Sequence, residues 1–379
     1  MIWLFTISLI VIVYGYFIYP AVLYYISQRY GNEPQSTQHY PDVAVVIAAF
    51  NEQQSIADRV KNLQALQYPG KLTFYIGSDG STDDTNAILA SFTDPRLRVF
   101  AFAENRGKIS VLNDLIDQVE QEVVVFSDAN TEFAIDAVTE LVSGLVDGVG
   151  AVCGKLHLYS KQDNENQDGL YWRYENFLKF HESRLGSLLG ANGAIYALRK
   201  SLYQPLAKDT VVDDFTIVMN VKKQGYKVIY RALASAREEV APTLNDEFGR
   251  RVRIGLGNYR ALHQCRWALA PKYGILAWCF WSHKVVRWFI PHLLILLLLS
   301  NLFLLEHGVF KLFLTAQIAF YLIAWLGMIK LKHNKKLSRI QAIITFFVLM
   351  NLALLKGFYQ FCFVKKQGSW QRTARGDSN

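Results

Sequence analysis

Amide and acidic side chains follow three apolar runs of this 379-residue chain. They are Asn51 with Glu52, Asp79 and Asp128, and each lies within three residues of the end of its run. A carboxylate accepts hydrogen bonds from N–H groups. These residue types therefore suit the binding of a polar ligand.

Basic residues in the same part of the chain suit an anionic ligand. Lys108 follows Gly107, which permits a ligand to approach the backbone closely, and a Lys there neutralises phosphate charge as a compact cation. Arg250 and Arg253 offer planar guanidinium groups, which bind anions through paired N–H donors. The alternative for Lys108 is an exposed surface residue, and the alternative for the arginines is a basic face against anionic lipid.

The segment that holds these residues predicts alternating strands and helices. Apolar runs of strand length cover residues 43–50, 72–76, 97–102 and 122–126. The first connecting segment has apolar residues at helical spacing, and capping residues and further apolar pairs predict a helix in each of the other two. This alternation implies a right-handed α/β sheet, whose ligands bind at the carboxyl ends of strands. We therefore expect Glu52, Asp79 and Asp128 at one cleft.

Several short motifs occur in an order that resembles the nucleotide-binding half of the family-2 glycosyltransferases. They are Ala48-Ala49-Phe50-Asn51-Glu52, Ser78-Asp79-Gly80-Ser81-Thr82-Asp83, Asn105-Arg106-Gly107-Lys108 and Ser127-Asp128-Ala129-Asn130. The likeness covers about two thirds of the chain, from Val43 to near Arg253. It implies a GT-A fold, which is the Rossmann-like fold of nucleotide-diphospho-sugar transferases, and inversion at the anomeric centre.

The resemblance implies how the donor is bound. Ala49, Asn51 and Glu52 border the nucleoside, Asp79 accepts the N–H of the base, and Lys108 and Arg250 contact the phosphates. Alternative interpretations stay open for the acidic pair: Asp79 is a turn-forming residue before a glycine, and Glu52 is a capping or solvated residue. The donor is expected to be a nucleotide-diphosphate sugar, with a UDP-sugar favoured.

A metal site is implied where the family has the sequence Asp-x-Asp. Here the motif reads Asp128-Ala129-Asn130, so the third position is neutral. Asn130 still offers a carbonyl oxygen, and Mg²⁺ or Mn²⁺ would depend more on Asp128 and the phosphates. We expect metal dependence with weaker affinity. The alternative is that Asp128 caps a helix beginning near Thr131.

Acceptor chemistry is implied further along the chain. Gly190–Arg199 resembles the family's acceptor-side strand, and Thr210–Phe215 lies where the family has its Thr-Glu-Asp type motif. By this resemblance Asp214 is the base that deprotonates the acceptor hydroxyl, and like-charge repulsion from Asp213 raises its pKa. The alternative is that both residues simply begin the helix at Phe215.

Arg250–Ile254 takes the place of the Gln-x-x-Arg-Trp signature of processive synthases such as those for cellulose and hyaluronan. Arg250 replaces Gln and Ile254 replaces Trp, whereas Arg253 keeps the position that stabilises the leaving diphosphate. The missing aromatic platform argues against long-chain processivity. Exopolysaccharide synthases of this membrane-bound type remain the nearest resemblance.

Hydropathy divides the chain into membrane and soluble parts. Residues 1–28 carry no charge and predict a retained transmembrane anchor, 41–265 form the GT-A domain, 266–287 predict an amphipathic interfacial helix, and 288–363 contain further spans. We expect the catalytic domain on the cytoplasmic side of the plasma membrane, in bacteria the inner membrane, and the positively charged segment 330–336 fits this orientation. The number of spans and the side of the basic tail, 364–379, stay open.

Composition excludes several classes of protein. The charge of +8 is concentrated beside apolar spans, which favours membrane lipid over nucleic acid as the partner. The four cysteines form no CxxC pair, so neither a zinc site nor a disulfide framework is predicted.

Three functions are compatible with these features. The first is transfer of a hexose-type sugar to a polysaccharide or lipid-linked saccharide, the second is transfer to polyprenyl phosphate, and the third is a catalytically weak membrane scaffold. The sequence names neither the sugar nor the acceptor.

Overall fold

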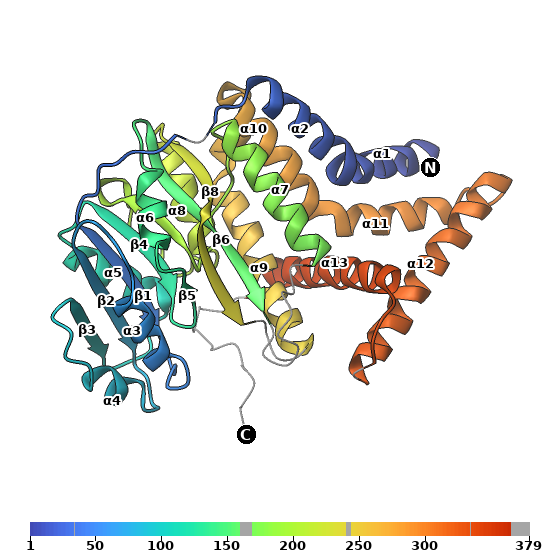
Figure 1. Cartoon of the computed structure of the whole chain (residues 1–379). Helices are drawn as coiled ribbons and strands as arrows, with labels where there is room; N and C mark the ends of the chain where they lie inside the picture. Colours follow the sequence, from blue (N-terminus) through green and yellow to red (C-terminus); the bar gives the residue numbers. More distant parts are fainter. Residues whose placement is uncertain (34, 160–168, 240–243, 334, 365–379) are drawn as a thin grey trace. The chain divides into compact units, whose positions relative to one another are not determined.

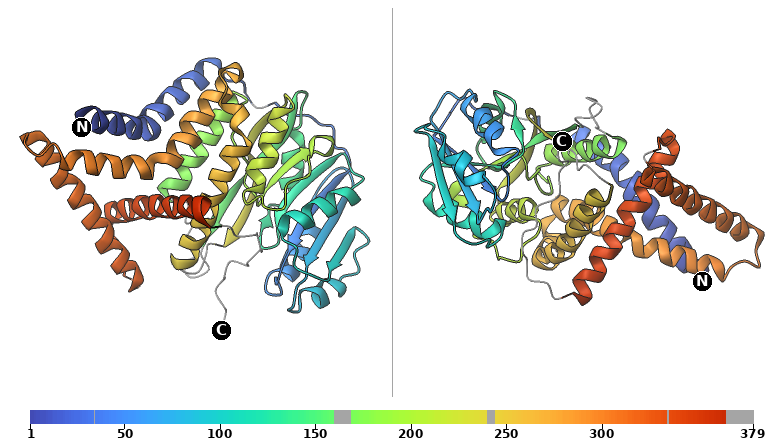
Figure 2. Two further views of the ribbon diagram at one scale, coloured as in Figure 1. Left: turned by 180° about the vertical axis from the view of Figure 1, so that it is seen from behind. Right: turned by 90° about the horizontal axis from the view of Figure 1, so that it is seen from below.

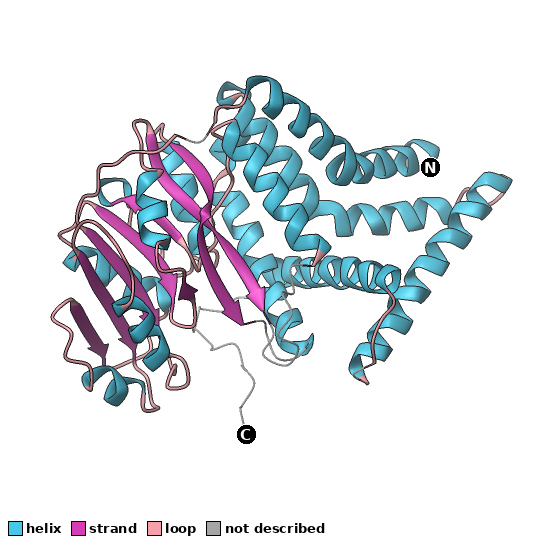
Figure 3. Ribbon diagram, in the orientation of Figure 1, coloured by secondary structure: helices cyan, strands magenta, loops and turns pink. Residues whose placement is uncertain are grey.

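The computed structural model describes residues 1–33, 35–159, 169–239, 244–333 and 335–364. These residues form two compact units, which we call the sheet unit (26–239) and the helical unit (1–25 with 244–364). Every described strand belongs to the sheet unit (Figure 3). Nearly all of the predicted basic tail lies outside the described residues.

A mixed β-sheet forms the centre of the sheet unit (Figure 1). In the described residues it has eight strands in the order β3-β2-β1-β4-β7-β6-β8-β5. The strands are β1 Val43–Ala49, β2 Leu72–Asp79, β3 Leu97–Phe102, β4 Val123–Asp128, β5 Glu132–Phe133, β6 Val149–Tyr159, β7 Tyr196–Arg199 and β8 Lys227–Glu239. The four strands predicted from apolar runs are confirmed as β1 to β4, which pair in parallel.

The pairing register brings the carboxyl ends of β1, β2 and β4 together. Ala49 lies opposite Ser78 of β2, and Ala48 lies opposite Asp128 of β4. Beyond β4 the direction changes, because β7 runs antiparallel to both β4 and β6. The polar residues that follow the three parallel strands are thus neighbours at one edge, as the alternating pattern predicts.

Helices cover both faces of the sheet (Figure 2). Alternate residues of β1 point to opposite faces: Val45 packs in a core with α3 and α6, and Val46 packs in a second core with α5 and α8. Burial on both faces explains why β1 is apolar throughout. The helices of this unit are α3 Ile56–Gln64, α4 Thr85–Ala90, α5 Lys108–Gln118, α6 Ala137–Ser143, α7 Leu170–Arg184 and α8 Asp213–Lys223.

Four helices of the described chain are long and apolar enough to cross a membrane. They span Ile2–Tyr30, Ile275–Leu302, Gly308–Lys332 and Arg339–Phe363. The first comprises α1 (Ile2–Val13) and α2 (Tyr19–Tyr30) around a π-helical stretch, and the second comprises α10 (Ile275–Cys279), another π-helical stretch and α11 (Val286–Leu302). The last two are α12 and α13.

Residues 266–287, which the sequence predicts as one interfacial helix, are divided in the structure. Two 3-10 turns cover Arg266–Leu269 and Pro271–Tyr273, and Gly274 has a positive φ of 53° that ends the second turn. From Ile275 onward the chain is helical without interruption into α11. The break follows from Pro271 and Gly274, since proline disrupts a helix interior and glycine permits left-handed backbone.

Helix α9, Leu244–Gln264, belongs to the helical unit although the predicted GT-A domain extended to residue 265. It packs on α13 through glycines: a side-chain carbon added at Gly357 would lie 2.8 Å from the Gly255 carbonyl carbon. The Tyr259 hydroxyl also donates a 2.6 Å hydrogen bond to the Trp288 carbonyl of α11. Small residues permit such close helix packing, and they join α9 to the apolar helices.

Candidate active site

Asp79 ends β2 and is fully buried. Its two carboxylate oxygens accept hydrogen bonds from the backbone N–H groups of Arg106, at 2.9 Å, and Gly107, at 2.8 Å. Gly107 has a φ of 90° and precedes the first residue of α5, which is Lys108. Asp79 therefore fixes the loop that places Lys108.

The loop after β1 is joined to the loop after β2. Asn51 has a φ of 53°, an uncommon backbone conformation that Asn tolerates better than most residues. The Asn51 N–H donates to the Ser81 hydroxyl at 3.1 Å, and the Asn51 side-chain oxygen accepts from the Thr82 N–H at 2.8 Å. Beside it, Glu52 is buried and accepts a 2.6 Å hydrogen bond from the Ser55 hydroxyl. These contacts hold the strand ends in one arrangement.

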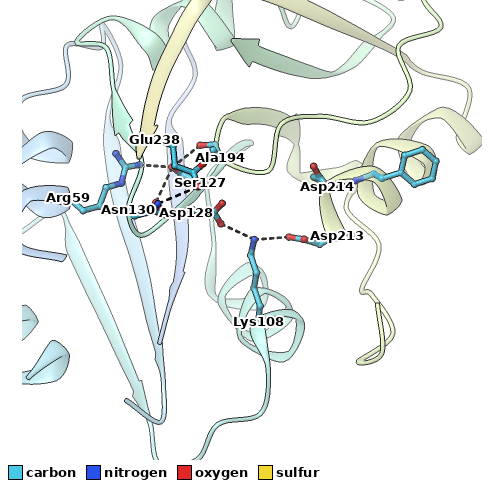
Figure 4. A network of polar contacts seen from close by, with 10 residues as sticks. Arg59, Lys108, Ser127, Asp128, Asn130, Ala194, Asp213, Asp214 and Glu238 are labelled. Carbon is cyan, nitrogen blue, oxygen red and sulfur yellow. Dashed lines mark hydrogen bonds and ion pairs between the residues drawn. The ribbon is translucent and has the colours of Figure 1, made fainter. Parts of the chain in front are cut away.

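Lys108 connects two carboxylates that come from different elements (Figure 4). Its ammonium lies 2.9 Å from Asp128 at the end of β4 and 3.1 Å from Asp213 at the start of α8. Burial alone would lower the pKa of Lys108, but attraction by the two carboxylates outweighs it and raises that pKa above its ordinary value. The lysine is therefore a permanent cation rather than an exposed surface residue.

Asp213 and Asp214 are the first two residues of α8. The alternative interpretation, that both residues begin a helix, is therefore also correct. The Phe215 N–H donates to an Asp214 carboxylate oxygen at 2.8 Å. Burial and repulsion by Asp213 raise the pKa of Asp214 to about 6, and the Phe215 hydrogen bond, Lys108 and Lys179 oppose this rise. A carboxylate with this pKa is ionised near neutral pH and basic enough to take a proton.

Asp128 and Asn130 lie at the end of β4 and in the loop that follows it (Figure 4). The amide nitrogen of Asn130 is 3.4 Å from a carboxylate oxygen of Glu238 on β8, and its buried amide oxygen has no hydrogen-bond partner among the described residues. The interpretation of Asp128 as the cap of a helix near Thr131 is wrong, because β5 follows there and α6 begins only at Ala137.

Arg59, which the sequence did not single out, contacts residues on both sides of this loop. It is 2% exposed, donates to the Ser127 hydroxyl at 2.8 Å and lies over the Phe133 ring at 4.4 Å. Burial lowers the pKa of Arg59 to about 9, although Asp128 and Glu132 oppose this. The sequence signal that could have identified Arg59 is its charge, because it lies between Ile56 and Val60 on the apolar stripe of α3.

The structure brings most of the predicted site residues together. These residues belong to the sheet unit and lie at or next to the ends of β1, β2 and β4 or at the starts of α5 and α8. They are Ala49, Asn51, Glu52, Asp79, Lys108, Asp128, Asn130, Asp213 and Asp214. Arg250 and Arg253 belong to α9 of the helical unit. Glu247 of α9 lies 2.6 Å from Arg251 and 4.0 Å from Arg250.

Residues 44–204 match the model of the family described as Glycosyl transferase family 2. The chain is similar to the mannosyltransferase PcManGT from Pyrobaculum calidifontis, solved in complex with GDP-Man and Mn2+, with a TM-score of 0.72 and 19% identity over 96% of this chain and 100% of that chain. That likeness shows the fold. The chain therefore has the GT-A fold, and residues 44–204 match glycosyl transferase family 2.

Curated relatives include poly-beta-1,6-N-acetyl-D-glucosamine synthases. The chain is 26% identical to the one from Staphylococcus aureus strain COL over 228 residues, which are 58% of this chain and 55% of the relative. It is 25% identical to the one from Staphylococcus epidermidis over 239 residues, 61% of this chain and 58% of the relative. The match thus spans little more than half of each relative. The four apolar helices of the described chain are those of a membrane protein.

Proposed function

We propose that the chain transfers a hexose-type sugar, with inversion, from a nucleotide-diphosphate sugar to a saccharide or lipid-linked saccharide at the cytoplasmic face of a membrane. A UDP-sugar is the favoured donor. The named relatives are N-acetylglucosamine polymer synthases, which supports an N-acetylhexosamine as the first sugar to test. The structural neighbour holds GDP-Man, so guanosine donors belong in the same test.

One observation carries this function. Lys108 lies between Asp128, at the end of a parallel strand, and Asp213, which is adjacent to the partly buried Asp214. A site of this kind places a cation for a diphosphate next to a carboxylate that takes a proton. Both groups are needed for displacement of a nucleoside diphosphate by a hydroxyl.

In the proposed reaction the oxygen of the acceptor hydroxyl attacks the anomeric carbon of the donor, and Asp214 takes the proton of that hydroxyl. A bond forms between that oxygen and the anomeric carbon, and the bond from this carbon to the diphosphate oxygen breaks. The nucleoside diphosphate leaves with the electron pair, and Lys108 and Arg253 offset its growing negative charge. The Asn51–Glu52 loop borders the nucleoside, and Asp79 holds the Arg106–Gly107 loop that places Lys108.

The residues after β4 fit a divalent cation. Asp128 provides a carboxylate, and the buried oxygen of Asn130 lacks a hydrogen-bond partner in the described chain, as expected of an oxygen ligand without its metal. In the described residues no three His, Cys, Asp or Glu side chains form a metal cluster, so the diphosphate would complete the coordination. When bound, Mg²⁺ or Mn²⁺ supplies positive charge to the diphosphate.

Turnover by the full chain in lipid nanodiscs tests this function. UDP- and GDP-sugars are supplied singly with Mn²⁺ and a lipid extract as acceptor source, and release of nucleoside diphosphate is measured. We expect release with at least one donor and its loss in Asp214→Asn. Equal release by both proteins would remove Asp214 from the reaction, and absence of release with every donor would favour the non-catalytic scaffold.

Transfer to polyprenyl phosphate is the second candidate function. The absence of the aromatic residue at Ile254 supports it, because a processive enzyme uses an aromatic platform to bind the growing glycan. Radiolabelled product separates the two functions: a chloroform-soluble ester of one sugar supports the second candidate, and a longer glycan supports the first.

A further inference from the structure

Lys179 of α7 carries a buried ammonium group in the sheet unit. Its side chain is 8% exposed, donates a hydrogen bond to the Asn192 amide oxygen and lies 5.7 Å from the centre of the Trp172 ring. In the part of the chain that the structure describes, no carboxylate forms an ion pair with it. Because lysine is rarely buried unless paired, and a buried charge costs stability, this ammonium calls for a functional explanation.

Its partner Asn192 is fixed from three sides. The amide oxygen accepts from Lys179, the amide nitrogen donates to the Gly154 carbonyl at 2.7 Å, and the backbone N–H donates to the Cys153 sulfur at 3.2 Å. Asn192 is itself 5% exposed. Lys179 therefore holds the turn that leads into β7 in a single conformation.

This turn lies against Asp214. A side-chain carbon added at Gly193, the residue after Asn192, would be 3.6 Å from an Asp214 carboxylate oxygen. Lys179 thus supports the backbone on which the carboxylate rests, and its positive charge acts on the same carboxylate. Attraction by Lys179 lowers the pKa of Asp214, against the larger upward effects of burial and Asp213.

The ionisable groups that interact with Asp214 come from five elements. They are Asp213 on α8 itself, Lys108 on α5, Lys179 on α7, Tyr196 on β7 and Cys153 on β6. Lys108 already pairs with Asp128 and Asp213, whereas Lys179 contacts a neutral amide and an aromatic ring in the described chain. Within the described residues Lys179 forms no ion pair, and its charge acts on Asp214 together with that of Lys108.

We propose that Lys179 is a positioning residue of the transfer reaction, which fixes the Asn192–Gly193 turn against Asp214 and keeps the Asp214 carboxylate anionic. The role presupposes that Asp214 is the base of the proposed function. Lys179 has no part in binding the diphosphate, so donor affinity should not depend on it. Removal of its charge should instead make Asp214 harder to ionise.

The experiment compares Lys179→Met with Lys222→Met in the full chain in nanodiscs. Lys222 is the matched control, because it is also buried, at 7% exposed, and donates to the Gly186 carbonyl at 2.8 Å from the far end of α8. Each protein is paired with its own Asp214→Asn variant, and the difference in Tm within each pair is followed from pH 4 to 9. The midpoint of that difference reports ionisation of Asp214.

We expect the midpoint of Lys179→Met to lie roughly 0.5 to 1 pH unit above that of the unmodified chain, as loss of a nearby opposite charge predicts. The acid limb of nucleoside diphosphate release should move by the same amount. Lys222→Met should lower Tm without moving either midpoint. An unmoved midpoint in Lys179→Met would overturn the role of Lys179.

Asn192→Asp provides a second variant if Lys179→Met does not fold. The new carboxylate pairs with Lys179 and removes its attraction from Asp214, so the midpoint should again rise, and an unchanged midpoint would also overturn the inference. The Tm readout needs no turnover. A chain that releases no nucleotide with any donor therefore counts against the proposed function, and the midpoint decides separately on Lys179.

Discussion

The ammonium of Lys108 lies 3.1 Å from a carboxylate oxygen of Asp213, the residue next to the proposed base. The same ammonium lies 2.9 Å from Asp128. One side chain thus links the strand end proposed to hold the metal with the helix that carries Asp214. Arrival of a diphosphate gives this cation a new anionic partner, so donor binding and the charge environment of the base are coupled.

Replacement of Lys108 by Met should weaken binding of UDP or GDP by roughly 10- to 100-fold, since a hydrogen bond to a charged group contributes about 1.5 to 3 kcal/mol. Isothermal titration calorimetry in nanodiscs measures this. Lys61→Met is the control, because the Lys61 ion pair with Asp58 is exposed on α3. Equal affinities for both variants would exclude Lys108 from phosphate binding.

Asp214→Asn should reduce nucleotide release by about 100-fold or more, because a positioned base contributes that much. In the unmodified chain the rate should rise with pH through about 6, the pKa of Asp214.

Asp214→Asn should also make the folded chain more stable at pH 7. A raised folded pKa means that the folded state binds more protons between about pH 4 and 6, so this contribution to stability is lost as pH rises through that window. Denaturant unfolding should show a gain of roughly 1 to 3 kcal/mol at pH 7 and little below pH 4.

Asn130 and Glu238 together carry one negative charge at the proposed metal site. Asn130→Asp alone should weaken Mn²⁺ binding despite the added carboxylate, because the new carboxylate and that of Glu238 repel each other and one becomes protonated. The double variant Asn130→Asp with Glu238→Gln restores a donor facing an acceptor and should bind Mn²⁺ with affinity close to that of the unmodified chain. Electron paramagnetic resonance of free Mn²⁺ with UDP present measures both. A double variant no better than the single one would separate Glu238 from the metal site.

Gly193→Ala should reduce turnover by about tenfold while Tm and nucleotide affinity stay unchanged. The added methyl would lie in ordinary contact, 3.6 Å from an Asp214 oxygen, so the fold tolerates it, but it fills space beside the base that the acceptor hydroxyl needs. Gly308→Ala, where an added carbon meets nothing within 4 Å, is the control. Unaltered turnover in Gly193→Ala would place the acceptor elsewhere.

Arg253→Ala should lower kcat by about 100-fold with a smaller effect on donor affinity, because the guanidinium acts on charge that develops in the transition state. Arg251→Ala is the neighbouring control, since Arg251 pairs with Glu247 on the same helix at 2.6 Å. Nucleotide release under saturating donor measures kcat. A comparable loss in both variants would indicate a role of α9 in stability or lipid contact instead.

The parallel half of the sheet could be predicted from sequence because it depends on local pattern. Continuous apolar runs and the polar residues that end them locate β1, β2 and β4, and therefore Asp79 and Asp128. Of the remaining strands only β7 could be predicted, since β8 mixes apolar with polar and partly exposed residues and β6 ends in a stretch that is only partly buried.

The site residues that the sequence did not reveal depend on contacts between distant segments. Arg59 reaches Ser127, Glu238 reaches Asn130 and Lys179 reaches Asn192, and none of these partners is near in sequence. That Asp79 uses both oxygens on backbone N–H groups is likewise a property of the folded loop. The residue type of Asp79 suggests a negatively charged hydrogen-bond acceptor, and only the fold identifies the N–H groups that donate to it.

The glycine contact between α9 and α13 determines which part of the enzyme should fail first outside a bilayer. Gly255 and Gly357 leave no side chain between the two backbones, so α9 depends for its shape on a helix that needs hydrocarbon around it. A harsh detergent that separates the apolar helices should melt α9 with them and leave the nucleotide-binding sheet folded. Such a preparation would retain UDP affinity and lose turnover, an inactivation that a simple binding assay would miss.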